Sequence, residues 1–182
     1  MAAADYTKVQ RVTFTSLISA LCVAIMFISR IVPIGIYAIP PICSLFIMVV
    51  LIEFGPKWSI GCYLVSAVLS ALFANPESSM VYIAFFGYYP ILKMLLERIN
   101  NSILKWIIKI LFFNTVIVAG YFILNLFVPV IEEFFAQGNL IFIFTVIAAE
   151  IMFVLYDICI AKLSVTYIQK YHRIIRKALK KQ

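Results

Sequence analysis

Six polar side chains interrupt the long apolar stretches of this 182-residue chain, and they are its first candidates for chemistry. The ionisable members are Arg30, Lys93, Glu150 and Asp157, and the amides are Asn114 and Asn125. A charged side chain at the centre of a bilayer costs at least about 2.5–3.5 kcal/mol on insertion scales, so such residues usually pair with one another or serve a function. Their positions along the apolar stretches suggest two groupings.

The first grouping is an ion pair between Lys93 and Asp157. With a rise of about 1.5 Å per helical residue, both side chains are expected in the inner third of their helices. A pair of opposite charges at that depth needs no ligand, so we interpret Lys93 and Asp157 as a structural ion pair.

The second grouping predicts a substrate-binding cavity in the outer half of the membrane. Its members carry guanidinium, phenol, amide or carboxyl groups: Arg30, Tyr37, Tyr88, Tyr89, Asn114, Tyr121, Asn125 and Glu150. Small-molecule sites are mostly apolar and aromatic, with a few placed polar groups, which suits this set. Tyr88 and Tyr89 precede Pro90, which should kink its helix. The alternative is that the two Asn side chains bond across helices and Glu150 stays protonated.

The elements that position these residues are membrane helices, as the composition shows. Apolar residues make up 65% of the chain and charged residues 13%, whereas soluble domains average roughly 45–50% apolar. A span needs about 20 apolar residues. The sequence therefore predicts an all-α, polytopic membrane protein, with one integral membrane domain over 1–182 and a basic cytoplasmic tail over 162–182. Six stretches qualify as transmembrane helices: 12–32, 36–52, 58–74, 79–96, 106–127 and 140–161.

The distribution of Lys and Arg predicts the orientation. If the N-terminus is inside, every basic residue except Arg30 falls on the inner side, while Glu77, Glu132 and Glu133 lie in outer loops. This follows the positive-inside rule and predicts that both termini are cytoplasmic. The rule also explains the net charge of +7, so we expect no nucleic-acid partner. The basic tail is interpreted as a solvated flank, with contact to membrane lipid as the alternative.

Small residues line one side of the first helix. Ser16, Ala20 and Ala24 recur every four residues, and such stripes let another helix approach closely in lipid. The stripe is a candidate docking surface for a partner protein. Packing against a neighbour in the same chain explains it equally well.

The sequence contains no recognisable motif for several kinds of catalysis and cofactor binding. There is no phosphate-binding loop, His-Glu-x-x-His, nucleophile elbow or acidic metal cluster. The four Cys residues fall inside apolar runs without metal spacing, so we interpret them as packing residues. The only histidine, His172, lacks a second ligand and is interpreted as a bystander. We expect no enzyme, no ATPase within this chain, no metal site and no cofactor.

Two passages resemble the substrate-binding subunits (S components) of energy-coupling factor (ECF) transporters. Residues 16–24, SLISALCVA, resemble the Ala-x-x-x-Ala segment by which those subunits meet their coupling subunit, with Ser16 in place of the first Ala. Residues 54–61, FGPKWSIG, resemble their Phe-Gly-Pro-x-x-Gly-type turn between the second and third helices, although Gly61 falls later than in many members. The length and the six short helices agree with this family.

The resemblance implies a protein of the bacterial cell membrane that captures a vitamin-like small molecule from outside. The capture site would lie among the fourth to sixth helices, under the loop 33–41. A transmembrane coupling subunit and two cytoplasmic ATPases would then power import by toppling the subunit.

Two other classes of function remain open from the residues alone. One is a membrane scaffold of a cell-envelope assembly, such as the rod-shape machinery, in which Glu150, Asn114 and Arg30 should tolerate substitution. The other is a self-contained transporter or channel, which predicts flux without ATPase partners.

Overall fold

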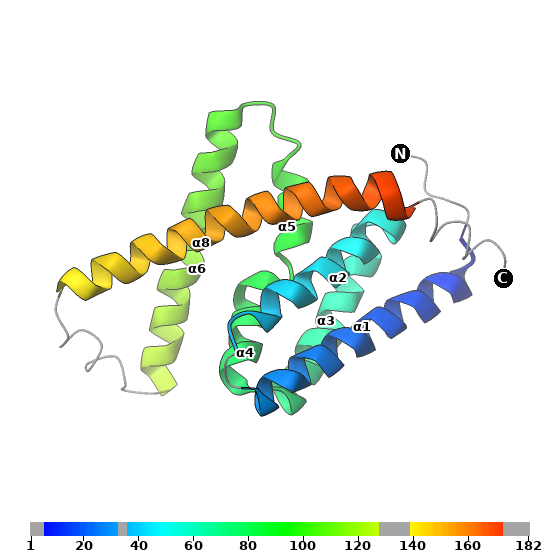
Figure 1. Ribbon diagram of the computed structural model, residues 1–182, viewed down its shortest axis with the longest axis horizontal. Helices are drawn as coiled ribbons and strands as arrows, with labels where there is room; N and C mark the ends of the chain where they lie inside the picture. Colours follow the sequence, from blue (N-terminus) through cyan, green and yellow to red (C-terminus); the bar gives the residue numbers. More distant parts are fainter. Residues whose placement is uncertain (1–5, 33–35, 128–138, 173–182) are drawn as a thin grey trace. The chain divides into compact units, whose positions relative to one another are not determined.

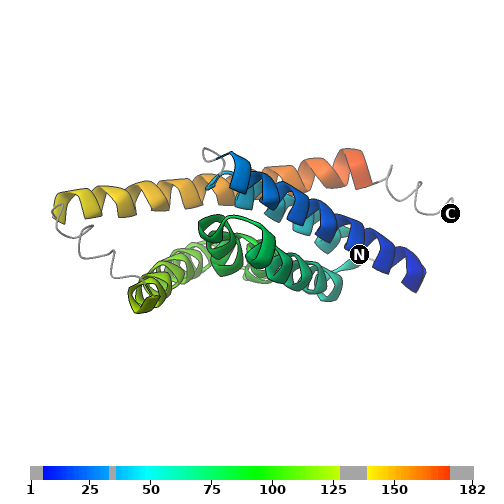
Figure 2. The same cartoon turned by 90° about the horizontal axis from the view of Figure 1, so that it is seen from below.

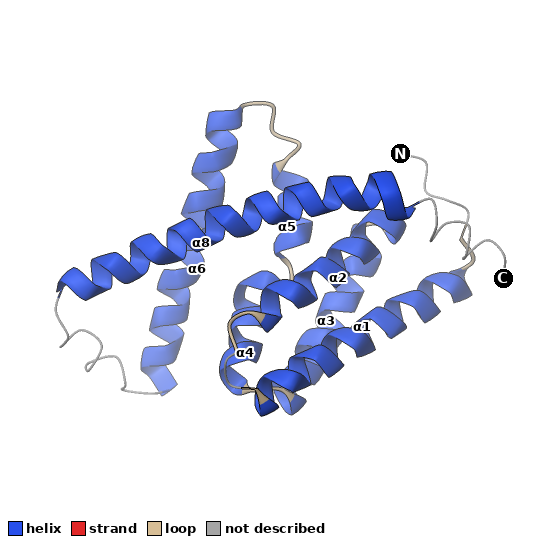
Figure 3. Ribbon diagram, in the orientation of Figure 1, coloured by secondary structure: helices blue, strands red, loops and turns tan. Residues whose placement is uncertain are grey.

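The computed structural model describes residues 6–32, 36–127 and 139–172, without the side chains of 121–127, 139–143 and 145, and the regular secondary structure in these ranges is all helical. No strand occurs within these ranges (Figure 3). The elements in chain order are α1 (Lys8–Ile31), α2 (Ile39–Phe54), α3 (Pro56–Phe73), α4 (Pro76–Val81), the π-helix η2 (Tyr82–Phe86), α5 (Tyr89–Leu96), α6 (Ser102–Phe127), α8 (Asn139–Thr166) and the π-helix η3 (Tyr167–Tyr171).

Several of these helices are long and apolar enough to cross a membrane. Among the described residues, four segments meet this criterion: Lys8–Ile31, Pro56–Phe73, Pro76–Leu96 and Ser102–Gly120. The shorter α2 is an apolar helix of 16 residues. The all-helical fold class and the membrane-type helices are thus confirmed, while the count of six spans and the cytoplasmic termini stay predictions.

The chain divides into two compact units. The first unit comprises Met1–Leu95 and Ile160–Gln182, and the second comprises Leu96–Cys159. α8 contributes residues to both. The predicted single domain over 1–182 stays a prediction.

Local sequence signals explain where the helices of the first unit begin and end. The Thr7 hydroxyl accepts the backbone N–H of Gln10, and the Gln10 side chain accepts that of Thr7. This reciprocal capping box starts α1 at Lys8, four residues before the predicted span. Between α2 and α3, Gly55 has φ of +86°, a conformation open to glycine, and Pro56 supplies the first residue of α3. Asn75 caps α4 by accepting the N–H of Glu77.

Small and polar residues let α1, α2 and α3 pack closely, and the three helices lie side by side in both views (Figures 1 and 2). The Ser19 hydroxyl of α1 donates to the carbonyl of Thr15 at 2.9 Å and lies 3.2 Å from the Cys62 sulfur of α3. Cys22 and Cys43 each place a sulfur 3.6–3.7 Å from the other's carbonyl oxygen. Cys22, Cys43 and Cys62 are therefore packing residues, as predicted, whereas Cys159 is exposed.

The fourth predicted helix is interrupted, as Pro90 indicated, but the break precedes the proline. The α-helix gives way to η2 at Tyr82, and a turn at Gly87 and Tyr88 leads into α5, in which Pro90 is the second residue. Pro at the start of a helix removes no hydrogen bond. A β-carbon at Gly87 would lie 2.5 Å from two ring carbons of Tyr63, whose hydroxyl donates to the carbonyl of Ile83 at 2.9 Å.

The last helix extends into the predicted tail. α8 continues to Thr166 and passes into η3, so helical structure covers residues that the sequence assigned to the cytoplasmic tail. The predicted span 140–161 lies wholly inside this helix.

We predict that Gly87→Ala destabilises the fold by about 1–3 kcal/mol, because the added methyl group overpacks a ring held by a hydrogen bond. The matched control is Gly61→Ala in α3, where a β-carbon meets nothing within 4 Å and alanine is the better helix former. Thermal unfolding of both variants in detergent measures the difference. Equal midpoints for the two variants would contradict the close approach at Gly87.

Candidate functional site

Three pairs of side chains join α6 to α8 inside the second unit. The amide nitrogen of Asn114 donates to Glu150 Oε1 at 2.5 Å. The rings of Phe113 and Phe153 stack, with centroids 4.5 Å apart. These side chains lie where α6 and α8 cross (Figure 1). The predicted site residues Asn114 and Glu150 are therefore brought together, by a bond across helices of the kind that the alternative to a cavity also predicts for Asn114.

The third pair is a buried salt bridge. Lys109 Nζ donates to both carboxylate oxygens of Asp157, at 3.0 and 2.8 Å, and both residues are only 3% exposed. The ammonium also lies 5.2 Å from the ring centroid of Trp106 and 3.9 Å from Glu97 Oε1. Two hydrogen bonds and a nearby aromatic face offset the cost of removing these charges from water.

Sequence reasoning missed Lys109 as a partner of Asp157. It grouped Lys109 with the charges of the inner flank and paired Asp157 with Lys93 instead. Lys93 is buried in α5 of the first unit, so a Lys93–Asp157 pair would join the two units and stays a prediction. The available signal was the spacing of Lys109, Phe113 and Asn114, which places all three on one side of α6.

Arg30 and Tyr37 lie at one end of the first unit. Arg30, near the end of α1, has Nη1 3.5 Å from the carbonyl oxygen of Phe73. The Tyr37 hydroxyl, just before α2, donates to Glu77 Oε2 at 3.4 Å. Both side chains are exposed, so they are accessible to a ligand at the end predicted to face outward.

Tyr88 and Tyr89 have mainly structural contacts in the first unit. The Tyr88 hydroxyl donates to the carbonyl of Ala84 at 2.6 Å, and its ring meets Tyr63 edge-on. Tyr89 is fully buried, with its ring 4.9 Å from that of Phe85. Tyr88 is half-buried and so retains some access to solvent or lipid.

The last two predicted site residues, Tyr121 and Asn125, belong to α6, but their side chains lie outside the described residues. The predicted cavity draws on residues of both units, and its assembly stays a prediction.

The small-residue stripe on α1 points away from the core of the first unit. Ser16, Ala20 and Ala24 are all exposed. Ser19 and Cys22 on the adjacent side are buried and make the contacts with α2 and α3. Internal packing of α1 therefore uses a different set of small residues and leaves the predicted stripe uncovered within its unit.

A cluster that sequence reasoning missed surrounds Glu53, at the end of α2. Glu53 Oε1 accepts the Tyr167 hydroxyl at 2.8 Å and lies 2.8 Å from His172 Nδ1, while Oε2 accepts the Tyr6 hydroxyl at 3.2 Å. We call these four residues the Glu53 cluster. The Glu53 side chain is fully buried. His172, interpreted as a bystander, is instead a partner of this carboxylate.

The Glu53 cluster holds the segment before α1 and the end of η3 against α2. Burial raises the pKa of the Tyr167 phenol above its ordinary value, and its hydrogen bond to Glu53 raises the pKa further. The phenol therefore stays protonated as a donor. The signal in the sequence was weak, because it consists of one acid just before Gly-Pro and one distant histidine.

The chemistry of these groups is that of binding and packing. Among the residues that the structure describes, no three His, Cys, Asp or Glu side chains gather as a metal site. Comparisons with models of protein families, with curated proteins and with solved structures find no match for this chain.

We predict that Glu53→Ala destabilises the fold by about 2–5 kcal/mol, because the Tyr6 and Tyr167 hydroxyls and the His172 ring all lose their buried hydrogen-bond partner. Glu77→Ala is the matched control: it removes an exposed carboxylate with one long hydrogen bond, and should cost less than about 1 kcal/mol. The unfolding midpoint of each variant in detergent measures this contrast. If Glu53→Ala were as stable as the control, the cluster would not be a structural anchor.

Proposed function

We propose that this chain is the substrate-capture subunit of an ECF-type importer in a bacterial cell membrane, with six spans and both termini in the cytoplasm. Its substrate is a vitamin-like small molecule taken up from outside. The observation that carries this proposal is the exposed stripe of Ser16, Ala20 and Ala24 on a helix whose other small residues are buried.

The stripe supports docking of a transmembrane coupling subunit. Bulky apolar side chains flank it, including Leu17 at 65% and Leu21 at 41% exposure. Lipid contact alone requires no small residues, whereas a partner helix packs most closely where side chains are small. The segment also resembles the docking segment of S components. Two cytoplasmic ATPases would supply the energy, since we expect this chain to contain no nucleotide-binding motif.

Capture of a small molecule is supported by the polar groups at the outer ends and middles of the helices. Asn114 and Glu150 form a hydrogen-bonded pair that is only half-buried. Arg30 and Tyr37 are exposed and offer a cation and a phenol. Such a set suits a ligand with both donors and acceptors. In this proposal Asn114 and Glu150 are the ligand-binding groups of the second unit, and Arg30 and Tyr37 are those of the first unit.

We predict that Ala20→Leu abolishes association with the coupling subunit and leaves the purified chain folded, because residue 20 is exposed and the larger side chain holds the partner helix away. Co-purification of a tagged chain from its native host measures association, and thermal unfolding checks the fold. The matched control is Leu21→Ala on the same helix, which removes bulk beside the stripe. Undiminished recovery of the coupling subunit with Ala20→Leu would refute the docking role.

We predict that Glu150→Ala removes ligand binding more than stability. A panel of water-soluble vitamins is screened for compounds that raise the unfolding midpoint of the wild-type chain, since a ligand of the folded state stabilises it. The variant should lose that stabilisation at an almost unchanged starting midpoint. Glu97→Ala, which removes a half-exposed carboxylate of the same unit, should retain it. Retained stabilisation in Glu150→Ala, with a lowered starting midpoint, would make Glu150 structural.

A further inference from the structure

An apolar groove runs between α2 and the C-terminal end of α8 with η3, within the first unit. Its volume is about 260 Å³. Ile42, Leu45 and Met48 line it from α2, and Leu163, Tyr167 and Tyr171 line it from the other side. None of the residues predicted to bind substrate lines this groove. It is therefore separate from the proposed capture site.

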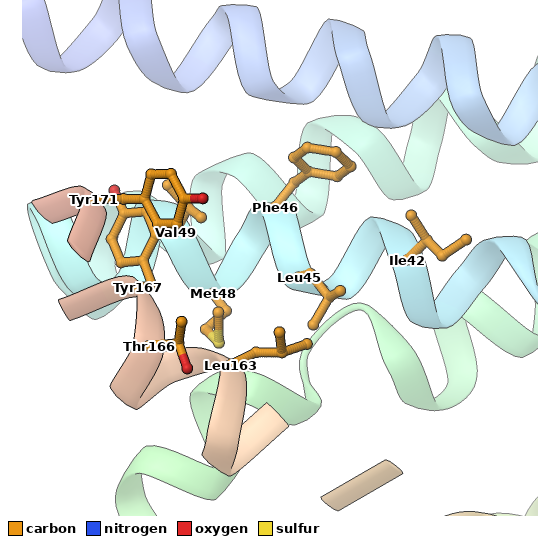
Figure 4. A pocket seen from close by; sticks show the side chains of 9 residues that line it. All are labelled: Ile42, Leu45, Phe46, Met48, Val49, Leu163, Thr166, Tyr167 and Tyr171. Atoms are coloured by element: carbon orange, nitrogen blue, oxygen red, sulfur yellow. The ribbon is translucent and has the colours of Figure 1, made fainter. Parts of the chain in front are cut away.

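The two ends of the groove differ in polarity. The rings of Tyr167 and Tyr171 stand at one end and Ile42 stands at the other, with Leu163 between them (Figure 4). Tyrosine is typical of the membrane–water boundary, because its ring suits the apolar side and its hydroxyl suits the polar side. An acyl chain with its headgroup at the tyrosine end fits this polarity.

Cations accompany the tyrosine end. Lys162, Thr166 and Lys170 follow one another at intervals of four residues, so they occupy successive turns of one helix side, and Thr166 lines the groove. The Thr166 hydroxyl is already satisfied by the Lys162 carbonyl at 2.9 Å. Both lysines are exposed, and a lysine can extend its stem along apolar surface toward a headgroup.

Acids are few near these cations. The acidic side chains of the first unit that the structure describes are Glu53 and Glu77. Glu53 lies near the tyrosine end, but its side chain is fully buried and bonded to Tyr6, Tyr167 and His172, and Glu77 bonds Tyr37, which precedes the opposite end of α2. Two exposed lysines therefore outnumber one buried acid at the tyrosine end, which favours an anionic ligand.

We propose that the groove binds one acyl chain of an anionic phospholipid from the surrounding leaflet, with the phosphate at Lys170 and Lys162. The apolar walls hold the chain, and the two lysines select the headgroup, each contributing electrostatic attraction to an anionic lipid. Because Tyr167 lines the groove and bonds Glu53, the bound lipid also stabilises the folded state around the Glu53 cluster.

The test uses the full-length chain in a neutral detergent and follows the midpoint of thermal unfolding. The probes are phosphatidylglycerol, phosphatidylcholine with the same acyl chains, and glycerol phosphate without acyl chains. A ligand that binds the folded state raises the midpoint. Phosphatidylglycerol should raise it by several degrees, phosphatidylcholine less, and glycerol phosphate not at all.

Variants separate the headgroup from the acyl chain. In the double variant Lys162→Gln with Lys170→Gln, phosphatidylglycerol should raise the unfolding midpoint no more than phosphatidylcholine does. The control Lys57→Gln, at the exposed start of α3, should keep the larger rise with phosphatidylglycerol. Leu163→Trp should fill the groove and remove stabilisation by both lipids, while Leu64→Trp on exposed α3 surface should not.

Three outcomes would overturn the proposal. Equal stabilisation of the wild-type chain by the two lipids would show that the groove does not select an anionic headgroup. Stabilisation by glycerol phosphate alone would assign the site to a free phosphate. An unchanged preference for phosphatidylglycerol in the double lysine variant, whose substitutions lie on exposed positions and leave the core intact, would place the lipid elsewhere.

Discussion

Carboxylates in an apolar chain need partners, and the partners found here connect distant parts of the sequence. Glu53 on α2 binds Tyr6, Tyr167 and His172, and Asp157 on α8 binds Lys109. In lipid the alternative to each of these bonds is an unpaired polar group, which is far more costly than in water. The partners therefore fix which helices are neighbours within each unit, while small residues fix how closely the helices approach.

Much of the fold could be predicted from local signals. The Gly-Pro turn at 55–56, the Asn-Pro turn at 75–76 and the interruption near Pro90 are set by backbone geometry, which a few residues determine. The start of α1 at Lys8 was missed although Thr7 and Gln10 form a capping box, because hydropathy marks the apolar core of a helix and not its polar first turn. The extension of α8 into the tail was missed for the same reason.

The partners of buried polar groups could be predicted only in part. Asn114 and Glu150 were placed in one group because both lie near the middle of consecutive predicted helices, and the structure joins them by a hydrogen bond. The salt bridge between Lys109 and Asp157 was not predicted, because depth alone does not say which side of a helix a residue occupies. The Glu53 cluster depends on the end of η3 reaching the end of α2, and 114 residues separate Tyr167 from Glu53. No local pattern carries that information.

The central claim is that this chain captures a small molecule for a coupled importer, and native mass spectrometry of the detergent-purified chain tests it most directly. The chain is expressed in rich medium, so that a ligand with slow dissociation survives purification. The account predicts one additional small mass on the wild-type chain, lost when the protein is unfolded, together with recovery of the coupling subunit and ATPases at low detergent. An empty chain that instead recovers only cell-envelope scaffold proteins would contradict it.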